Sequence, residues 1–460
     1  MSGEIHQETS RTHPGARKRR KVVVTGLGAT TALGGDVTST WDAMLRGENG
    51  IRRLDDDPAM RDMPRQIGGR VRVEPGPGLE PLQRVRLSRT AQLAVTAAGE
   101  AWQDAGLAGF AGDPERVAVV VAAAVADMTA LIDGWEALKN RGWNRVPPLT
   151  APLSMGNASA AAVSVLLDAR AGANTTVSAC SSGTQAVATA ADLIRRGVVD
   201  VVAAGGAEAP LHPMVLGAFA AMQALSKRVD DPASASRPYD RDRDGMVLGE
   251  GAGVLIMESE EHARARGARC YAEVVGIGSS SDAYHLVQPE PSGKGTAKAI
   301  LHSLADAGLA PADVAHVNGN GVATGAGDAS EARGIRDVFE GTARPPAVSA
   351  NKSMIGHTLG AAGAIESIAT VLSLHHGTVP PTRNFTAAER GLFLHVVHDA
   401  PWQLGDGEAV AVKNSSGFGG HNVARASAAR RSGPAPDPSA GSRARIAGGA
   451  AIPPAGAGGR

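Results

Sequence analysis

Cys180 has the sequence context of a catalytic nucleophile. Residues 175–183 pass from β-branched residues through small ones into a stretch with helical periodicity. This pattern predicts that Cys180 lies at a turn between a strand and a helix N-terminus, where the helix dipole and unpaired backbone N–H groups favour a thiolate and can stabilise an oxyanion. A lone cysteine is more often buried and inert, but this context favours a nucleophile that holds an acyl group as a thioester.

Composition excludes several classes of protein. Lys plus Arg equals Asp plus Glu, so no net field would attract nucleic acid or an anionic membrane. No apolar run reaches the roughly 18 residues expected of a membrane span. The second cysteine, Cys270, stands in an arginine-rich stretch and is predicted to be structural, so neither a disulfide framework nor secretion is expected. We therefore expect a soluble cytoplasmic protein.

Short valine-rich runs that alternate with longer helical stretches predict a layered α/β fold with parallel strands. The predicted strands cover residues 21–26, 117–121, 200–206, 272–278 and 314–318. The predicted helices cover residues 88–105, 183–196 and 295–307. Because the pattern restarts near Cys270, the order of elements predicts two similar halves.

Composition and element order together divide the chain into four segments. The first and last are rich in polar, basic or small residues and lack an apolar face, so they are predicted to be disordered. The middle two are the predicted halves, the first carrying the cysteine. The segments cover residues 1–20, 21–262, 263–428 and 429–460.

Six separated motifs resemble those of the β-ketoacyl-ACP synthases, the ketosynthases of fatty-acid and polyketide assembly. The resemblance spans nearly all of residues 20–428 and implies a thiolase-like fold with αβαβα layers built from two similar halves. The motifs are VVVTGLG at 22–28, the segment around Cys180, RPYDRDRDG at 237–245 followed by GEGAG at 249–253, SDAYH at 281–285, NKSMIGH at 351–357 and GFGG at 417–420.

The resemblance also implies a catalytic mechanism. In this family the cysteine accepts an acyl chain from the phosphopantetheine arm of a carrier protein, and two histidines support decarboxylation of a malonyl unit. His357 matches one histidine, Lys352 precedes it at the family spacing, and Glu366 matches the acidic partner of that lysine. Asn320 stands where the family has the other histidine. An amide can donate a hydrogen bond but cannot carry a proton as imidazole does, so we expect decarboxylation to suffer most.

Five further residues are predicted by resemblance to contact the substrate. Thr324 remains in the loop that meets the pantetheine arm, and Phe418 matches the gating aromatic residue beside the cysteine. Ser416 replaces the usual phenylalanine. His421 replaces the usual threonine, so it either lines an altered pocket or binds backbone carbonyls. His285 ends the SDAYH motif.

The changed loops around a retained cysteine favour a repurposed active site. We expect an enzyme of polyketide or hybrid peptide biosynthesis that loads a carrier-bound β-ketoacyl chain on Cys180 and then closes a ring without decarboxylation. Aldol-type bond formation and lactonising release would give a γ-lactam-β-lactone, as in the similar bicyclase of salinosporamide-type biosynthesis. The alternatives are a decarboxylative β-ketoacyl-ACP synthase, a non-elongating acyltransferase between carrier proteins, and a partner subunit that sets chain length, which Cys180 argues against.

The partners predicted by resemblance are an acyl or peptidyl carrier protein and a second copy of the chain. The histidines are scattered without cysteine or carboxylate partners at ligand spacing, so no metal site is predicted. The glycine-rich turns near Gly26 and Gly249 lack the context of a phosphate-binding loop. We therefore expect no cofactor other than the arm that delivers the substrate.

Overall fold

The structure is a computed structural model of the 460-residue chain that describes residues 19–76 and 81–430. Residues 1–18 and 431–460 make up most of the two segments predicted to be disordered, and they lie outside the described residues.

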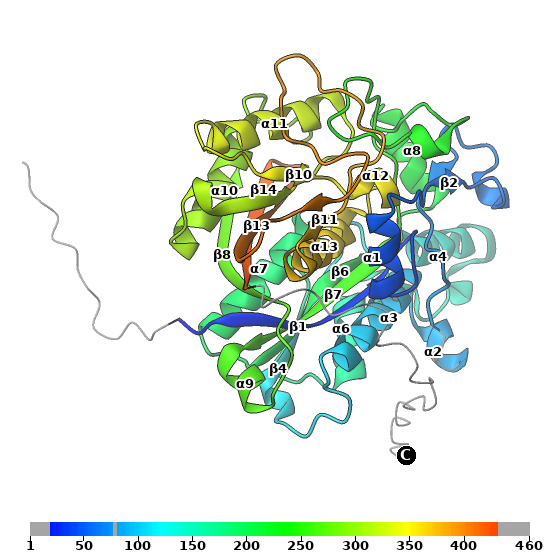
Figure 1. Ribbon diagram of the computed structural model, residues 1–460. Helices are drawn as coiled ribbons and strands as arrows, with labels where there is room; N and C mark the ends of the chain where they lie inside the picture. The colour runs from blue at the N-terminus through cyan, green and yellow to red at the C-terminus, as the bar shows by residue number, and fades with distance from the viewer. Residues whose placement is uncertain (1–18, 77–80, 431–460) are drawn as a thin grey trace, which may run out of the picture.

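The framework of the described residues is a ten-stranded mixed sheet (Figure 1). Its strands are β1 (Val22–Thr30), β4 (Val117–Ala122), β5 (Ala173–Asn174), β6 (Val201–Glu208), β7 (Gly251–Ser259), β8 (Ala272–Ser281), β9 (Val314–Asn318), β10 (Ala347–Ser349), β13 (Glu408–Gly417) and β14 (His421–Arg430). Two small antiparallel pairs accompany it: β2 (Arg52–Arg53) with β3 (Ile67–Gly68), and β11 (Thr378–Val379) with β12 (Trp402–Gln403).

The spatial order of the strands repeats in the two halves. The N-terminal half runs β5-β4-β6-β7-β1 and the C-terminal half runs β10-β9-β13-β14-β8. In each half the first three strands are parallel and the last two are antiparallel to their neighbours. The halves join where β1 pairs with β8, through Val23–Glu273 and Val24–Ala272. The predicted pair of similar α/β halves is confirmed, but the prediction of purely parallel strands is wrong for β1, β7, β8 and β14.

Helices cover both faces of the sheet and also fill the space between its halves. They are α1 (Val37–Leu45), α2 (Pro81–Arg86), α3 (Arg89–Asp104), α4 (Met128–Arg141), α5 (Thr150–Ser154), α6 (Ala158–Leu167), α7 (Ser182–Arg195), α8 (Pro213–Ala221), α9 (Glu260–Ala265), α10 (Lys294–Ala307), α11 (Gly325–Phe339), α12 (Lys352–Ile355) and α13 (Ala362–His376).

The central layer consists of α7 and α13, which pack on each other and on strands of both halves (Figure 1). The helix α13 is buried from Ala362 to Leu374, which explains why its residues there are apolar or small on all sides, with Glu366 as the exception. The helices α3 and α6 cover the outer face of the N-terminal strands, and α10 and α11 lie over the C-terminal half. Strands buried on both faces explain the continuous valine-rich runs.

Glycines let the outer helices approach the strands at the centre of the sheet. A Cβ atom on Gly28 of β1 would lie 1.9 Å from the carbonyl oxygen of Ala97 in α3. A Cβ atom on Gly278 of β8 would lie 2.1 Å from the carbonyl oxygen of Ala299 in α10. In both halves, therefore, a glycine allows the backbone of a helix to pack directly on the backbone of a strand.

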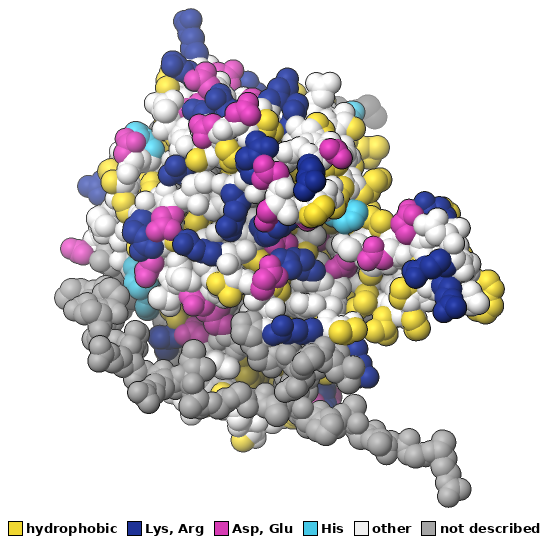
Figure 2. Space-filling view, turned by 90° about the vertical axis from the view of Figure 1, so that its right-hand side faces the viewer, with side chains coloured by type: hydrophobic (Ala, Val, Ile, Leu, Met, Phe, Trp, Pro, Cys, Tyr) yellow, Lys and Arg dark blue, Asp and Glu magenta, His cyan; other side chains and the backbone are white. Residues whose placement is uncertain are grey.

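The surface of the described residues carries mixed charge. On the face in Figure 2, the basic and acidic side chains are interspersed and no extended region of one sign is formed. Within residues 19–76 and 81–430, no helix combines the length and apolar character needed to cross a membrane.

We predict that Gly278→Ala destabilises the fold by about 1–3 kcal/mol, or more, because the added methyl group meets helix backbone that cannot move aside. The midpoint of urea or thermal unfolding measures this. Gly156→Ala is the matched control, since a Cβ atom there has nothing within 4 Å. Equal unfolding midpoints for the two variants would contradict the prediction.

Candidate active site

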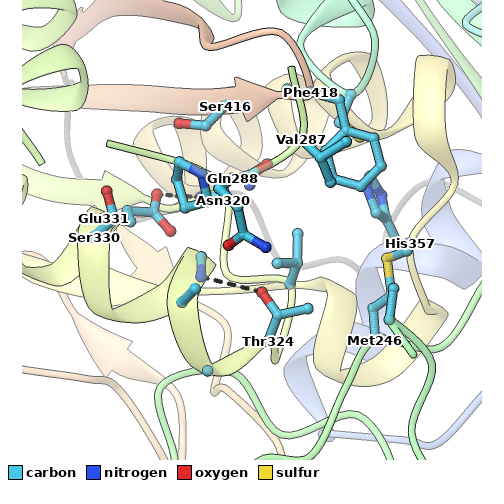
Figure 3. Close-up of a pocket in the computed structure, with 18 of the residues that line it drawn as sticks. Met246, Val287, Gln288, Asn320, Thr324, Ser330, Glu331, His357, Ser416 and Phe418 are labelled. Atoms are coloured by element: carbon cyan, nitrogen blue, oxygen red, sulfur yellow. Dashed lines mark hydrogen bonds between the residues drawn. The ribbon is translucent and has the colours of Figure 1, made fainter. Parts of the chain in front are cut away.

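A cavity of about 400 Å³ brings together residues from both halves (Figure 3). Its lining includes Cys180, Asn320, His357 and Phe418. Cys180 comes from the N-terminal half, while the other three come from loops at the ends of C-terminal elements. Four residues that are far apart in the sequence and were predicted to act together therefore share one cavity.

Cys180 lies in a tight turn, two residues before the first residue of α7. The backbone N–H groups of Ser181 and Ser182 donate to the carbonyls of Ser178 and Ala179, at 3.2 and 3.1 Å. Ala179 has φ of +51°, which non-glycine residues rarely adopt. The predicted helix N-terminus is confirmed, whereas the preceding strand β5 already ends at Asn174.

The thiol of Cys180 is protonated in the resting protein. Burial raises its pKa to about 11, and the ammonium of Lys352 and the backbone N–H groups of Phe418 and Cys180 offset only part of this effect. Backbone N–H groups at this turn do favour the thiolate, as expected, but desolvation of the charged form has the larger effect and the pKa remains raised.

His357 is a neutral hydrogen-bond donor. The backbone N–H of Leu359 donates to its Nδ1 at 3.3 Å, so the neutral ring carries its proton on Nε2. The buried Nε2 has no hydrogen-bond partner among the described residues. Burial, together with the ammonium groups of Lys352 and Lys413, holds the pKa of His357 well below 6.5. The ring therefore remains uncharged at neutral pH, with Nε2–H available to a substrate oxygen.

Lys352 orients the amide of Asn320. Its Nζ donates to the backbone carbonyl of Asn320 at 2.5 Å and to Oδ1 at 3.3 Å, and it pairs with Glu366 Oε1 at 2.5 Å. Because Oδ1 faces the ammonium, the amide nitrogen points away from it. Figure 3 shows that nitrogen in the cavity, on the side nearer His357. Asn320 thus presents a second N–H donor.

Two carboxylates of α11 hold the loop that carries Asn320, and sequence reasoning missed both. Glu331 accepts the backbone N–H groups of Asn320 and Gly321, at 2.6 and 2.8 Å. Asp328 accepts those of Val322 and Ala323, at 2.9 and 3.1 Å. Two acidic residues spaced one turn apart near the start of a helix, directly after a predicted catalytic loop, are the signal that could have found them.

Three of the predicted substrate contacts lie on the cavity wall. Ser416 donates to Asn422 Oδ1 at 2.8 Å, so part of its hydrogen-bonding capacity is already used. The hydroxyl of Thr324 accepts the Gly327 N–H at 3.3 Å and thereby caps α11. Phe418 remains 36% exposed and packs against Phe219, with ring centroids 6.3 Å apart. An exposed aromatic ring over the cavity agrees with the predicted gating position.

The two other histidines predicted to contact substrate are exposed and lie outside the cavity lining. His285 Nδ1 accepts the backbone N–H groups of Val287 and Gln288, both at 3.0 Å, and those two residues do line the cavity. His285 therefore shapes the loop without reaching the cavity itself. His421 begins β14, where its ring packs near Gly419.

Known families and structures match nearly the whole described chain. The family model "Beta-ketoacyl synthase, N-terminal domain" matches residues 19–263, and "Beta-ketoacyl synthase, C-terminal domain" matches residues 271–386. The chain is 40% identical over 406 residues to 3-oxoacyl-(acyl-carrier-protein) synthase 2 of Mycobacterium tuberculosis, covering 88% of this chain and 96% of the relative. The protein of the same name from Coxiella burnetii is 38% identical over 407 residues, covering 88% and 97%.

Solved structures share the fold. A beta-ketoacyl synthase from Burkholderia phymatum superposes with a TM-score of 0.81 at 32% identity, covering 90% of this chain and 100% of that one. A ketosynthase described in complex with its type II PKS acyl-carrier protein gives a TM-score of 0.82 at 30% identity, with the same coverage. The predicted thiolase-like fold is confirmed.

These relatives overturn the predicted cyclisation. Proteins that are 38–40% identical over almost their full length are named 3-oxoacyl-(acyl-carrier-protein) synthase 2, and none of these names indicates ring closure or lactone release. The prediction of a γ-lactam-β-lactone-forming cyclase was wrong because it took the changed loop residues, Asn320 among them, as evidence of a changed reaction. Asn320 lines the cavity and still has an N–H donor, so the loss of an imidazole there does not by itself indicate different chemistry.

We predict that the alkylation rate of Cys180 by iodoacetamide rises about tenfold per pH unit from pH 7 to 10, because the thiolate fraction grows up to a pKa of about 11. Intact mass measures the adduct in a Cys270→Ser background, and Cys180→Ala serves as the blank. A plateau by pH 9 would indicate an ordinary thiol and contradict the prediction.

Proposed function

The chain belongs to the β-ketoacyl synthase family, and from this premise we propose that it is a decarboxylative 3-oxoacyl synthase. It would join an acyl group held on Cys180 to a malonyl unit brought by an acyl carrier protein. The observation that carries this proposal is the pair of N–H donors, on His357 and Asn320, in the same cavity as the cysteine.

In the first step, Cys180 is acylated. Its sulfur attacks the thioester of the incoming chain, the bond from the carbonyl carbon to the pantetheine sulfur breaks, and the thiol proton leaves with that sulfur. The backbone N–H groups of Phe418 and Cys180, which favour negative charge at this position, are suited to stabilise the oxyanion that forms.

In the second step, the malonyl unit loses carbon dioxide. The bond to the carboxylate breaks and its electron pair remains in the thioester as an enolate, so negative charge develops on the carbonyl oxygen. Donors from His357 and Asn320 stabilise this oxygen without accepting a proton. The enolate carbon then attacks the Cys180 thioester, a C–C bond forms, and the released sulfur takes a proton from solvent.

This chemistry explains why a neutral histidine and an asparagine suffice. No step asks either residue to act as a base, and a histidine with a strongly lowered pKa would be a poor proton carrier. The absence of a second imidazole is therefore compatible with decarboxylation. The non-elongating acyltransferase would use the first step alone and would leave the two donors without a role.

We propose two partners. The first is an acyl carrier protein, as in the solved ketosynthase complex that resembles this chain. The second is another copy of the chain, seated on the edge strand β5, because edge strands carry unpaired backbone groups. Large apolar side chains are exposed nearby, with Val165 at 74% and Val177 at 65%. A homodimer through this edge would cover both.

We predict that Asn320→Ala lowers the rate of malonyl-carrier decarboxylation by on the order of 10²-fold, because one oxyanion donor is lost. Release of carbon dioxide from malonyl carrier protein measures the rate. Acylation of Cys180, followed by intact mass, should remain within about twofold. Asn320→His restores a donor and should recover most of the rate. Full decarboxylation in Asn320→Ala would refute the proposed role.

We predict that Val165→Asp dissociates the dimer, because it places charge in an apolar contact. Sedimentation or light scattering measures the mass. Leu301→Asp is the control, since Leu301 is also an exposed apolar residue but lies on α10, on the other half. A monomeric wild type, or dissociation by both variants, would contradict this interface.

A further inference from the structure

Lys413 is a fully buried cation that the proposed steps do not use. It lies on β13 with 0% exposure, and its Nζ is surrounded by oxygen atoms. It pairs with Glu366 Oε2 at 2.8 Å and donates to the backbone carbonyls of Gly319, at 3.1 Å, Asn318, at 3.4 Å, and Asn414. Carbonyl and carboxylate oxygens gathered around one positive charge are the environment in which proteins hold a small cation.

We call the oxygen atoms around Lys413 Nζ the cation cage. Its carbonyls belong to segments that end in the active site. Asn318 and Gly319 directly precede Asn320, and Asn414 precedes the loop that carries Phe418. In the sheet, Lys413 is the register partner of Asn318. The ammonium therefore joins the ends of β9 and β13 at the point where each strand leads into the cavity.

Glu366 links this cage to the catalytic amide. One of its oxygens pairs with Lys352 and the other with Lys413, so the carboxylate lies between two ammonium groups. Lys352 in turn holds Asn320. A buried ion left without its partner is strongly unfavourable, so loss of one ammonium would disturb the other pair.

We propose that Lys413 is a positioning residue that acts as a covalently tethered cation. Its ammonium fixes Glu366 and the ends of β9 and β13, and through them the donors of Asn320 and Phe418. The inference rests on the proposed condensation for its kinetic consequence, but the cation cage exists whatever reaction the site performs.

The charge of Lys413 depends on pH. Burial lowers its pKa to about 8, although the carboxylates of Glu366 and Glu331 oppose the shift. The ammonium is thus retained at neutral pH and lost as pH rises through about 8. Four other titratable or charged groups face Lys413 or lie on the elements around it. They are Lys352 on α12, His316 on β9, His357 after α12, and Arg425 on β14, which is the cross-strand partner of Lys413.

The test replaces Lys413 by methionine, whose unbranched side chain is one atom shorter and carries no charge. K413M should lower kcat for condensation by on the order of 10²-fold with little change in KM, because the donors are misplaced while the cavity remains. The wild-type rate should fall as pH rises through about 8, and K413M should lack this fall. Activity equal to wild type, with the same pH profile, would overturn the proposal.

Rescue separates a tethered cation from a merely structural lysine. In K413A, ammonium or methylammonium chloride should restore activity saturably and raise the unfolding midpoint, whereas tetramethylammonium, which is too large and donates no hydrogen bond, should do neither. Arg425→Met is the matched control. It removes a buried cation from the paired strand, bonded to Ser427 and Ser367, and should lower stability without ammonium-dependent recovery.

The two proposals can fail separately. A wild type that acylates Cys180 but does not condense would refute the proposed function, while an ammonium-dependent rise in the unfolding midpoint of K413A would still support the cation cage. Conversely, active wild type together with K413A that shows neither rescue nor a shifted midpoint would overturn the role of Lys413 alone.

Discussion

The active site depends on one buried carboxylate. Glu366 lies inside the central helix α13 and pairs with Lys352 and Lys413, and all three side chains are almost fully excluded from solvent. Moving an ion into a protein interior costs several kcal/mol, so such a cluster persists only where every charge is compensated. Lys352 also donates hydrogen bonds to the backbone carbonyl and to Oδ1 of Asn320. The position of the Asn320 amide is therefore determined by electrostatics deep within the fold.

The same cluster determines what the site can do with protons. Positive charge and burial keep His357 neutral, and burial keeps Cys180 as a thiol. Cys180, His357 and Asn320 therefore present hydrogen-bond donors, and none of the three carries a charge in the resting site. A reaction that creates negative charge by breaking a carbon–carbon bond suits such a site, because the electrons come from the departing carboxylate and the protein has only to stabilise the enolate oxygen.

Sequence patterns predicted most elements and several residues of the candidate site. Predicted strands and helices such as 117–121, 314–318 and 183–196 lie within a few residues of β4, β9 and α7, because strong periodicity reflects burial on defined faces. Motif spacing identified Cys180 and His357, which the fold brings into one cavity. The raised pKa of Cys180 could not be predicted, since burial of the thiol is a tertiary property. The role of Lys413 was not predicted, because its partners Asn318 and Glu366 become its neighbours only through sheet register and helix packing.

The junction between the halves explains why neither half could form the site alone. A Cβ atom on Gly417 of β13 would lie 2.7 Å from the carbonyl oxygen of Ser178 and 2.9 Å from the nitrogen of Cys180. The C-terminal half thus presses its backbone directly against the nucleophile turn. On the other side of that turn, a Cβ atom on Gly183 would lie 2.6 Å from the nitrogen of Ala364 in α13. These two close backbone approaches fix the cysteine relative to α13 and β13. The distance from the thiol to the donors of the site therefore follows from how the halves pack. A substitution at either glycine would alter that distance without changing any side chain that lines the cavity beside the thiol.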